Sequence, residues 1–324
     1  MAHHARIARI GRALVLAGSL FSATAFAFPD QPIRLLIPYP PGGSADALAR
    51  PLTPILEKEL GQSVVVDYRP GGGGVIATSE LARAKPDGHT ILMVLAAHAI
   101  NPSLRSSLPY DTEKDFAGVS LLATLPLIVA APKSTPADDI PSLIKYAKAH
   151  PGELTFASAG PGNTSHLAGE LFKVSTGTDL LHVPYKGSGP AVIALLGGEV
   201  SLMFDSISTS LPQVRAGKLK ALAVTGKERS GLLPDLPTVG ETVDGFEVSG
   251  WYGILAPAGT PPEAIQKLNK AFVAAVKNPK ARAQLENIGY SIDGSTPEAF
   301  DAHIKREIKR WADIIESSGT PKIN

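Results

Sequence analysis

Short apolar runs alternate with stretches of helical periodicity along almost the whole chain, and this alternation limits the fold more than any other feature. The runs are about five residues long, as in Ile33 to Ile37 and Thr90 to Leu95. The stretches between them carry apolar side chains three or four residues apart, as Leu48, Leu52 and Leu56 do. Strands that alternate with helices predict an α/β fold with a parallel sheet.

The alternation forms two blocks. A longer apolar run from Leu121 to Ala131, interrupted by Pro126, ends the first block. An irregular connection at 226–249, rich in glycine and proline, ends the second, and Trp251 to Leu255 then predicts a strand that returns across the molecule. A length of 324 residues also suggests two domains. We therefore expect a clamshell of two α/β blocks between which the chain crosses twice.

The boundaries of these predicted units follow from the pattern. The expected domains are 28–124 with 251–324, which together form a discontinuous domain 1, and 125–250, which forms domain 2. The predicted strands are 33–37, 64–66, 90–95, 154–158, 180–183, 200–204, 220–225 and 251–255. The predicted helices begin near residues 45, 75, 143, 166, 190 and 211, and two or three more finish the chain.

Proline and capping residues refine the helix predictions. Pro51 and Pro54 lie inside the first helical stretch and predict a kink there. Thr260-Pro261-Pro262-Glu263 predicts a capping box, and Thr296-Pro297 repeats the cap and the proline. A buried stripe is expected on the last helix, formed by Ile304, Ile308, Trp311 and Ile315.

Residues 1–27 have the pattern of a secretory signal peptide. Arg6, Arg9 and Arg12 precede an apolar run from Ala13 to Ala23, and Ala25-Phe26-Ala27 is a small-x-small cleavage signature. The run is too short to span a bilayer, which argues against the alternative of a membrane anchor. We expect cleavage after Ala27 and an exported, slightly acidic mature chain in the periplasm.

Composition excludes several classes of function. The absence of cysteine rules out disulfides, thiolate metal sites and a thiol nucleophile. A formal net charge of +1 argues against a nucleic-acid partner. His89, His98, His166 and His182 have no metal-ligand spacing, so we expect neither a metal nor a cofactor. We also expect a monomer.

Two glycine-rich turns, one in each block, share the order strand, turn, helix start. The first is Pro38-Tyr39-Pro40-Pro41-Gly42-Gly43-Ser44-Ala45-Asp46, and the second is Ser158-Ala159-Gly160-Pro161-Gly162-Asn163-Thr164-Ser165-His166. Glycine lets a ligand approach the backbone, and N–H groups at a helix start favour an anion such as a carboxylate. Each turn alone is explained by ordinary capping, but the pair suggests that both grip one small acid across a cleft. Neither turn is a nucleotide-binding motif.

An exported hydrolase is an alternative that uses Ser158 with His166 as its base. The sequence has no G-x-S-x-G elbow and no evident third partner, so a structural or ligand-contacting histidine is favoured. Trp251 could line the cleft or belong to the core or hinge.

Many short stretches, in order along the mature chain, resemble one family. They include Pro40-Pro41-Gly42-Gly43-Ser44-Ala45-Asp46, Arg69-Pro70-Gly71-Gly72-Gly73-Gly74, Lys85-Pro86-Asp87-Gly88, His182-Val183-Pro184-Tyr185-Lys186-Gly187 and Ala256-Pro257-Ala258-Gly259-Thr260-Pro261. The chain resembles the periplasmic solute-binding proteins of tripartite tricarboxylate transporters, the Bug-type receptors. Tyr68 departs from the family pattern, which commonly has Asn before Arg-Pro-Gly, and we expect it to lie away from the ligand.

The resemblance implies the type II periplasmic-binding-protein fold, with two α/β domains that are joined by crossing strands and close on a small carboxylate. It implies delivery of that acid to integral-membrane transporter subunits. An alternative is a receptor that docks to a membrane sensor kinase. In neither case is the chain an enzyme.

The site residues that the resemblance implies fall into three groups. The first turn contributes Tyr39, Pro41, Gly42, Gly43, Ser44 and Asp46. The opposing turn contributes Ser158, Gly160, Gly162, Asn163 and His166. Further contacts are expected from Ala97, His98, Tyr185, Lys186 and Asp205.

Overall fold

A computed structural model of the protein describes residues 28–323, and the predicted signal peptide lies outside these residues. The described strands form one mixed sheet in the order β2-β1-β3-β9-β4-β7-β5-β6, with β8 and β10 also paired to β4. The strands are β1 (Ile33–Ile37), β2 (Val64–Tyr68), β3 (Thr90–Leu95), β4 (Phe116–Pro132), β5 (Thr155–Ser158), β6 (Leu181–Pro184), β7 (Leu202–Ser206), β8 (Leu219–Val224), β9 (Ser249–Pro257) and β10 (Ser291–Ile292).

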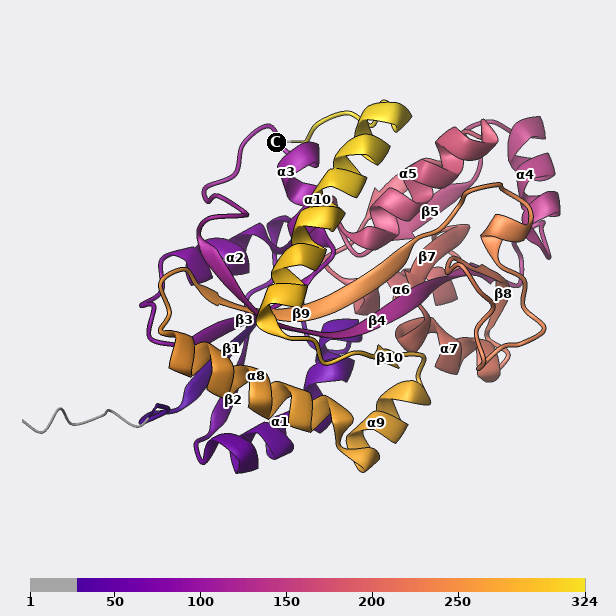
Figure 1. Cartoon of the computed structure of the whole chain (residues 1–324). Helices are drawn as coiled ribbons and strands as arrows, with labels where there is room; N and C mark the ends of the chain where they lie inside the picture. Colours follow the sequence, from indigo (N-terminus) through magenta and orange to yellow (C-terminus); the bar gives the residue numbers. More distant parts are fainter. Residues whose placement is uncertain (1–27, 324) are drawn as a thin grey trace, which may run out of the picture.

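Helices cover both halves of this sheet (Figure 1). They are α1 (Ser44–Leu60), α2 (Val75–Ala82), α3 (Ala97–Leu104), α4 (Ile140–Ala149), α5 (Thr164–Thr176), α6 (Ser188–Leu196), α7 (Ile207–Arg215), α8 (Pro262–Lys277), α9 (Pro279–Glu286) and α10 (Pro297–Ser318). None of the described helices combines the length and the apolar character that a membrane crossing needs.

The β4–β9 pair joins the two halves, and in Figure 1 both strands run across the middle of the molecule. β9 pairs antiparallel with β4 from Phe116↔Pro257 to Pro126↔Ser249. From Leu127 onward, β4 pairs with β7 and β8 instead. The predicted interruption at Pro126 is therefore a change of partner inside one 17-residue strand. Proline has no N–H to donate, and it therefore fits a position where the backbone hydrogen bonds of β4 change from one neighbouring strand to the next.

The prediction of a parallel sheet is correct only within each half. β1 pairs parallel with β2 and β3, and β5 pairs parallel with β6 and β7. β4 and β9 pair antiparallel with all of their neighbouring strands. β8, which was predicted as one more strand of the second block, also pairs antiparallel with β4. The crossing strands run against their neighbours because each enters one half from the other.

Local signals explain most of the helix boundaries. Helix α1 continues through both prolines to Gly61, whose positive φ of 68° favours glycine. Thr296 caps α10 as predicted, with its side chain accepting from the Ala299 N–H. The predicted capping box at Thr260 is wrong: Pro261 occupies the N-cap of α8, and Thr260 Oγ1 instead donates to the Pro257 carbonyl at 2.7 Å.

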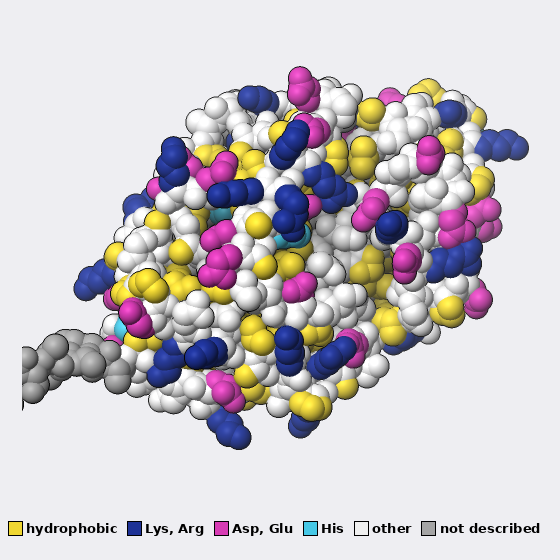
Figure 2. Space-filling view, viewed as in Figure 1, with side chains coloured by type: hydrophobic (Ala, Val, Ile, Leu, Met, Phe, Trp, Pro, Cys, Tyr) yellow, Lys and Arg dark blue, Asp and Glu magenta, His cyan; other side chains and the backbone are white. Residues whose placement is uncertain are grey.

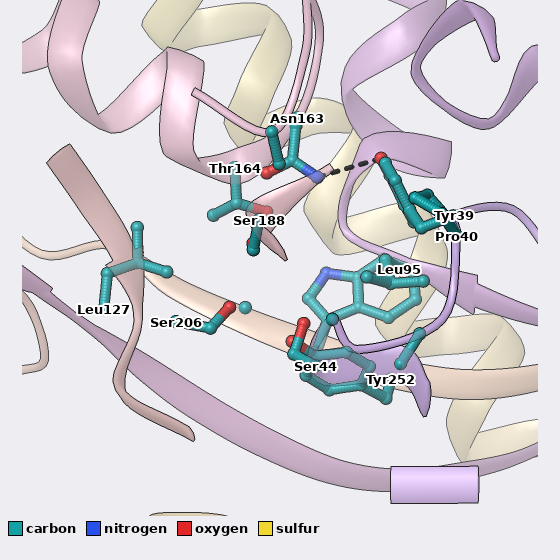
Figure 3. Close-up of a pocket in the computed structure, with 15 residues that line it drawn as sticks. Tyr39, Pro40, Ser44, Leu95, Leu127, Asn163, Thr164, Ser188, Ser206 and Tyr252 are labelled. Carbon is teal, nitrogen blue, oxygen red and sulfur yellow. Dashed lines mark hydrogen bonds between the residues drawn. The ribbon is translucent and has the colours of Figure 1, made fainter. Parts of the chain in front are cut away.

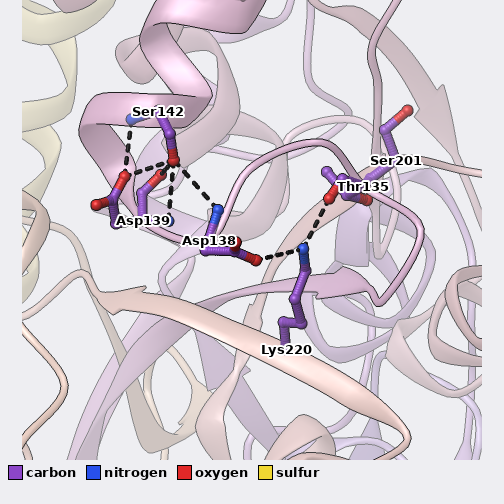
Figure 4. Close-up of polar contacts among 6 residues, drawn as sticks. All are labelled: Thr135, Asp138, Asp139, Ser142, Ser201 and Lys220. Atoms are coloured by element: carbon purple, nitrogen blue, oxygen red, sulfur yellow. Dashed lines mark hydrogen bonds and ion pairs between the residues drawn. The ribbon is translucent and has the colours of Figure 1, made fainter.

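A capping box that the sequence prediction missed begins α4 at Ile140, three residues before the predicted start (Figure 4). Asp139 Oδ1 accepts from the Ser142 N–H at 2.8 Å, and Ser142 Oγ accepts from the Asp139 N–H. Lys220 on β8 fixes the preceding loop, because its Nζ contacts the Thr135 carbonyl at 2.7 Å and Asp138 Oδ1 at 2.8 Å.

Two aromatic side chains of α10 pack on the crossing strands. Trp311 and Phe300 are both 0% exposed, and the Phe300 ring lies edge-on to Trp251 of β9 at 5.8 Å between ring centroids. Gly253 on β9 gives the Phe300 ring its space, since a Cβ at this position would lie 2.1 Å from the ring. Glycine in the middle of a strand is explained here by close packing of a helix.

We predict that Gly253→Ala destabilises the protein by about 1–3 kcal/mol, because the new methyl group overlaps the Phe300 ring in a tightly packed core. Urea denaturation followed by circular dichroism measures the change. Gly189→Ala is the matched control, because its Cβ meets no atom within 4 Å. Equal stability of both variants would contradict this packing role.

Candidate ligand-binding site

A small cavity lies where the carboxyl ends of strands from both halves meet (Figure 3). Its volume is about 20 Å³, on a scale where one water needs roughly 10–15 Å³. The residues that line it are Tyr39, Pro40, Gly43, Ser44, Ala45, Leu95, Leu127, Ala159, Asn163, Thr164, Ser188, Ser206, Gly250, Trp251 and Tyr252. In open-ended α/β sheets, ligands bind outside the carboxyl ends of strands, and this cavity has that location.

The first glycine turn is held from behind by Asp46. Asp46 Oδ2 accepts from the Gly42 N–H and from Arg50 Nε, both at 2.8 Å, and Oδ1 accepts from the Tyr68 hydroxyl at 2.5 Å. Burial raises the pKa of Asp46, but these hydrogen bonds outweigh it and hold the pKa below its usual value. Asp46 therefore shapes the turn, and Tyr68 supports it without lining the cavity.

The second turn rests on Ser158 and two stacked histidines. Ser158 Oγ lies 2.6 Å from His182 Nε2 and accepts from the Gly160 N–H at 3.1 Å. His166 Nδ1 accepts from the Gly162 N–H at 3.3 Å, and its ring stacks on His182 at 4.1 Å between centroids. Burial is the largest cause that lowers the pKa of His166 to about 3 and that of His182 to about 4. Both imidazoles are therefore neutral when the turn is formed.

These contacts leave no role for the predicted hydrolase pair. Ser158 is hydrogen-bonded to His182, not to His166, and Ser158 is 0% exposed. A nucleophile in this position has no surface on which a substrate carbonyl could approach.

Direct contacts join the two turns. Asn163 Nδ2 donates to the Tyr39 hydroxyl at 2.9 Å, which is the dashed line in Figure 3. A Cβ placed on Gly73 would lie 2.4 Å from the Pro161 carbonyl oxygen, and one on Gly187 would lie 3.0 Å from the Pro40 ring. Glycine at these two positions, both with positive φ, allows the halves to approach closely.

Four helices begin at the cavity. Ser44 of α1, Thr164 of α5 and Ser188 of α6 are the first residues of their helices, and Ser206 is the N-cap of α7. Asn163 caps α5 with its side chain, whereas no side chain caps α1, α6 or α7. Each helix start carries about half a positive charge and unsatisfied N–H groups, so together they form an environment for an anion.

No Lys or Arg side chain lines this cavity. Its polar side chains are the hydroxyl groups of Tyr39, Ser44, Thr164, Ser188, Ser206 and Tyr252 and the amide of Asn163. The indole N–H of Trp251 is used elsewhere, in a hydrogen bond to Glu307 at 3.2 Å. Trp251 thus lines the cavity and belongs to the core at the same time, with 2% of its surface exposed. Recognition of charge in this cavity depends on helix starts and hydroxyl groups.

The structure divides the sixteen sequence-predicted site residues into three sets. Four line the cavity: Tyr39, Gly43, Ser44 and Asn163. A second set holds the turns or lies behind the cavity wall: Asp46, Ser158, Gly160, Gly162, His166 and Asp205. The remaining six do not line it, and of these Pro41, Gly42 and Lys186 are exposed, Tyr185 is half-buried, and Ala97 and His98 are buried.

His98 lines a different cavity, of about 90 Å³, between α3, the start of β4 and α10. Its ring makes edge contacts with Phe116 at 5.3 Å between centroids. The turn of α3 directs the imidazole away from the cavity between the halves, although Leu95, three residues earlier, lines that cavity.

Ser188, Ser206 and Tyr252 were missed as cavity residues. Ser188 begins α6 after the glycine turn at Gly187, so the rule that identified the two glycine turns would have found it. Ser206 is the last residue of β7 and the N-cap of α7, with no glycine turn before it, so that rule would not have found it. Tyr252 carries no such signal, since its neighbours on β9 read only as a buried strand. Among the described residues, no group of three or more His, Cys, Asp or Glu side chains is placed to hold a metal.

Comparison with known proteins supports the geometry. Residues 48–320 match the model of the tripartite tricarboxylate transporter family receptor, TctC. The chain belongs to this family. BugT of Bordetella pertussis is 37% identical over 316 residues, which is 97% of each chain. Like other members of this family, the chain is a solute receptor and not an enzyme.

Two solved structures extend the match to the fold. The periplasmic binding protein BugD has a TM-score of 0.88 and 36% identity, covering 91% of this chain and 100% of BugD. MatC from Rhodopseudomonas palustris, solved with bound malate, has a TM-score of 0.85 and 34% identity, covering 89% and 100%. The predicted two-domain periplasmic-binding fold and the predicted family are therefore confirmed.

The buried histidine pair predicts an acid-sensitive receptor. In the unfolded chain both histidines have a pKa near 6.5. In the folded chain the pKa of His166 is about 3 and that of His182 is about 4, so neither ring is protonated at pH 5. Stability is therefore complete above about pH 6.5 and falls as the pH is lowered towards 4, by up to about 2 kcal/mol per histidine between pH 7.5 and 5.

Urea denaturation between pH 5 and 7.5 measures how steeply the free energy of unfolding depends on pH. We expect His166→Gln to reduce this slope, because one of the buried histidines with a lowered pKa is removed. A His166→Gln slope equal to that of the wild type would contradict the assignment.

Proposed function

We propose that this chain is a periplasmic receptor that binds one small organic acid between its two halves, closes on it and delivers it to integral-membrane transporter subunits. The observation that carries the proposal is the convergence of four helix starts, three of them without a side-chain cap, on one cavity between the halves. A carboxylate supplies the acceptors and the negative charge that these helix starts lack. MatC, a relative of similar fold, was solved with the carboxylate malate.

The acid contacts that we propose come from both halves. Tyr39, Gly43 and Ser44 offer hydroxyl and backbone N–H groups from the first turn, and Asn163 offers its amide from the second. Ser188 and Ser206 extend this set beyond the sequence prediction. The turn-supporting residues, such as Asp46 and Ser158, act through the shape of the backbone.

Binding requires the halves to separate. A cavity of about 20 Å³ admits roughly one water, far less than a small organic acid. We propose two moving units. One consists of residues 28–124 together with 251–324, and the other consists of residues 125–250. Strands β4 and β9 connect them. The change of partner at Pro126, next to the lining residue Leu127, supports a hinge of β4 at this point. Closure then contributes selectivity, because only a ligand that contacts both halves favours the closed state.

Localisation and partners follow from the same proposal. Removal of residues 1–27 on export would place the mature chain in the periplasm, as a monomer without a nucleic-acid partner. On the face in Figure 2, acidic and basic side chains are interspersed. The membrane subunits are the proposed partners because the family is the receptor of tripartite transporters.

We predict that Gly43→Val abolishes binding and preserves the fold. Gly43 has an ordinary extended backbone, with φ of −89°, and its Cβ would meet nothing nearer than the Pro40 carbonyl oxygen at 3.8 Å, so valine is accommodated but occupies the cavity. Gly162→Val is a poorer test, because its φ is +77° and its Cβ would lie 2.9 Å from Asn101 Oδ1. Gly231→Val is the control, at a surface glycine with no atom within 4 Å of its Cβ.

A thermal-shift screen against mono-, di- and tricarboxylates identifies an acid, and calorimetry then compares the variants. We expect at least a hundredfold loss of affinity in Gly43→Val and none in Gly231→Val. Normal affinity in Gly43→Val would contradict binding at this cavity.

The cross-cleft hydrogen bond gives a second prediction. Tyr39→Phe removes the bond from Asn163 and weakens the closed state by about 1 kcal/mol, which lowers affinity about fivefold. Tyr146→Phe removes a comparable hydroxyl contact, to Glu153, at an exposed site. Small-angle scattering should show a larger open fraction for Tyr39→Phe alone, and an identical profile for both variants would contradict the role of this bond in closure.

A further inference from the structure

The cavity between the halves has a buried acid in its wall. Asp205 lies in β7, immediately before the last residue of the strand, the lining residue Ser206, and is 0% exposed. Its Oδ2 accepts from the Ser210 hydroxyl at 2.6 Å and from the Thr209 hydroxyl, whereas Oδ1 has no hydrogen-bond partner among the described residues. This carboxyl group lies at the start of α7, where it uses the positive end of that helix.

Asp205 acts electrostatically together with residues of the cavity wall. Burial raises the pKa of Asp205, and Ser210, Thr209 and the lining residue Ser188 oppose this effect. Burial is also the main cause that raises the pKa of Tyr252, another lining residue, and the charge of Asp205 acts in the same direction. An anion in the cavity therefore experiences both the helix starts and this carboxyl group.

A charge balance follows from these positions. Four helix starts contribute about half a positive charge each, and an ionised Asp205 removes one charge, which leaves about one positive charge for the ligand. No Lys or Arg side chain lines the cavity to add to it. One carboxylate matches this balance and two exceed it.

We propose that the cavity takes an acid with a single carboxylate group, and that Asp205 is the residue that excludes a second one. This inference rests on the proposed function and narrows its ligand class. It differs from what MatC, a relative of similar fold, was solved with, because malate carries two carboxylates.

The mechanism of exclusion is like-charge repulsion in a water-poor space. When a second carboxylate enters beside buried Asp205, the pair cannot both remain ionised and must retain one proton. Binding of a diacid therefore takes up a proton and weakens as the pH rises, whereas binding of a monoacid does not.

A matched pair of ligands tests this on the mature wild-type protein. 2-Hydroxybutyrate and malate differ only in that malate has a carboxylate where 2-hydroxybutyrate has a methyl group. Calorimetry in buffers of different ionisation enthalpy gives the affinity and the number of protons taken up. At pH 7.5 we expect 2-hydroxybutyrate to bind at least tenfold more tightly. Lowering the pH to 6.5 should strengthen malate binding up to tenfold, with proton uptake, and leave 2-hydroxybutyrate unchanged. Equal or tighter binding of malate at pH 7.5 without proton uptake would overturn the inference.

Asp205→Asn tests the residue itself, since asparagine keeps the shape and removes the charge. Malate should gain at least tenfold more in affinity than 2-hydroxybutyrate does, because the removed charge repels two carboxylates more than one. Asp244→Asn, at an exposed acid in the same half, should change neither. Parallel weakening of both ligands in Asp205→Asn would assign Asp205 a purely structural role and overturn the inference. If this variant does not fold, the proton count on the wild type decides the question alone.

The wider screen separates this inference from the proposed function. Benzoate, phthalate and citrate extend the panel to aromatic acids and to a triacid. Preferential binding of phthalate or citrate would defeat only the single-carboxylate inference. If none of the five acids stabilised or bound the protein, the proposed function itself would fail.

Discussion

The antiparallel pairing of β4 with β9 is the constraint on which the rest of the structure depends. β4 is shared, since its first half pairs with β9 and its second half with β7 and β8. This arrangement fixes the direction of the parallel strands on either side, so that β1 and β3 of one half and β5 and β7 of the other end at the same place. The helices that follow those strands then begin around one cavity.

The part of β4 around Pro126, where we propose a hinge, is stabilised by hydrogen bonds of Thr225. Thr225 is 0% exposed and connects β4 to the segment that enters β9: its hydroxyl donates to the Val248 carbonyl at 2.6 Å and accepts from the Leu127 N–H at 2.9 Å. These bonds compensate for Pro126, which contributes no N–H. In the proposed closure, the region around Thr225 stays fixed and the contacts between the turns change, among them the hydrogen bond from Asn163 to Tyr39.

The fold was predictable from the sequence because periodicity and glycine turns are local signals. The strand at 33–37 and the capped helix at Thr296 needed only their own residues. Antiparallel crossing strands were not predictable in the same way, because Leu121 to Ala131 reads as one apolar run whichever partners it takes. The error at Thr260 has a local cause: a hydroxyl before a helix can accept from a helix N–H or donate to a nearby carbonyl, and here Pro261 is the N-cap while Thr260 donates to the Pro257 carbonyl.

The parts of the candidate site that one continuous turn of the chain forms were predictable, whereas the parts that depend on the packing of distant elements were not. Both glycine turns follow from short sequence patterns, but Tyr252 enters the cavity only because β9 lies beside β4. His98 shows the opposite failure: Leu95 at the end of β3 lines the cavity between the halves, whereas His98, three residues later in α3, lines another cavity.

Asp205 follows the same reasoning. Its place just after the predicted strand at 200–204 was visible in the sequence, but the role that we propose for it depends on the helix starts around the cavity, which in our charge balance leave charge for one carboxylate and not two. In this proposal selectivity depends on a charge balance summed over four helices, and a single buried acid shifts that balance by a whole unit.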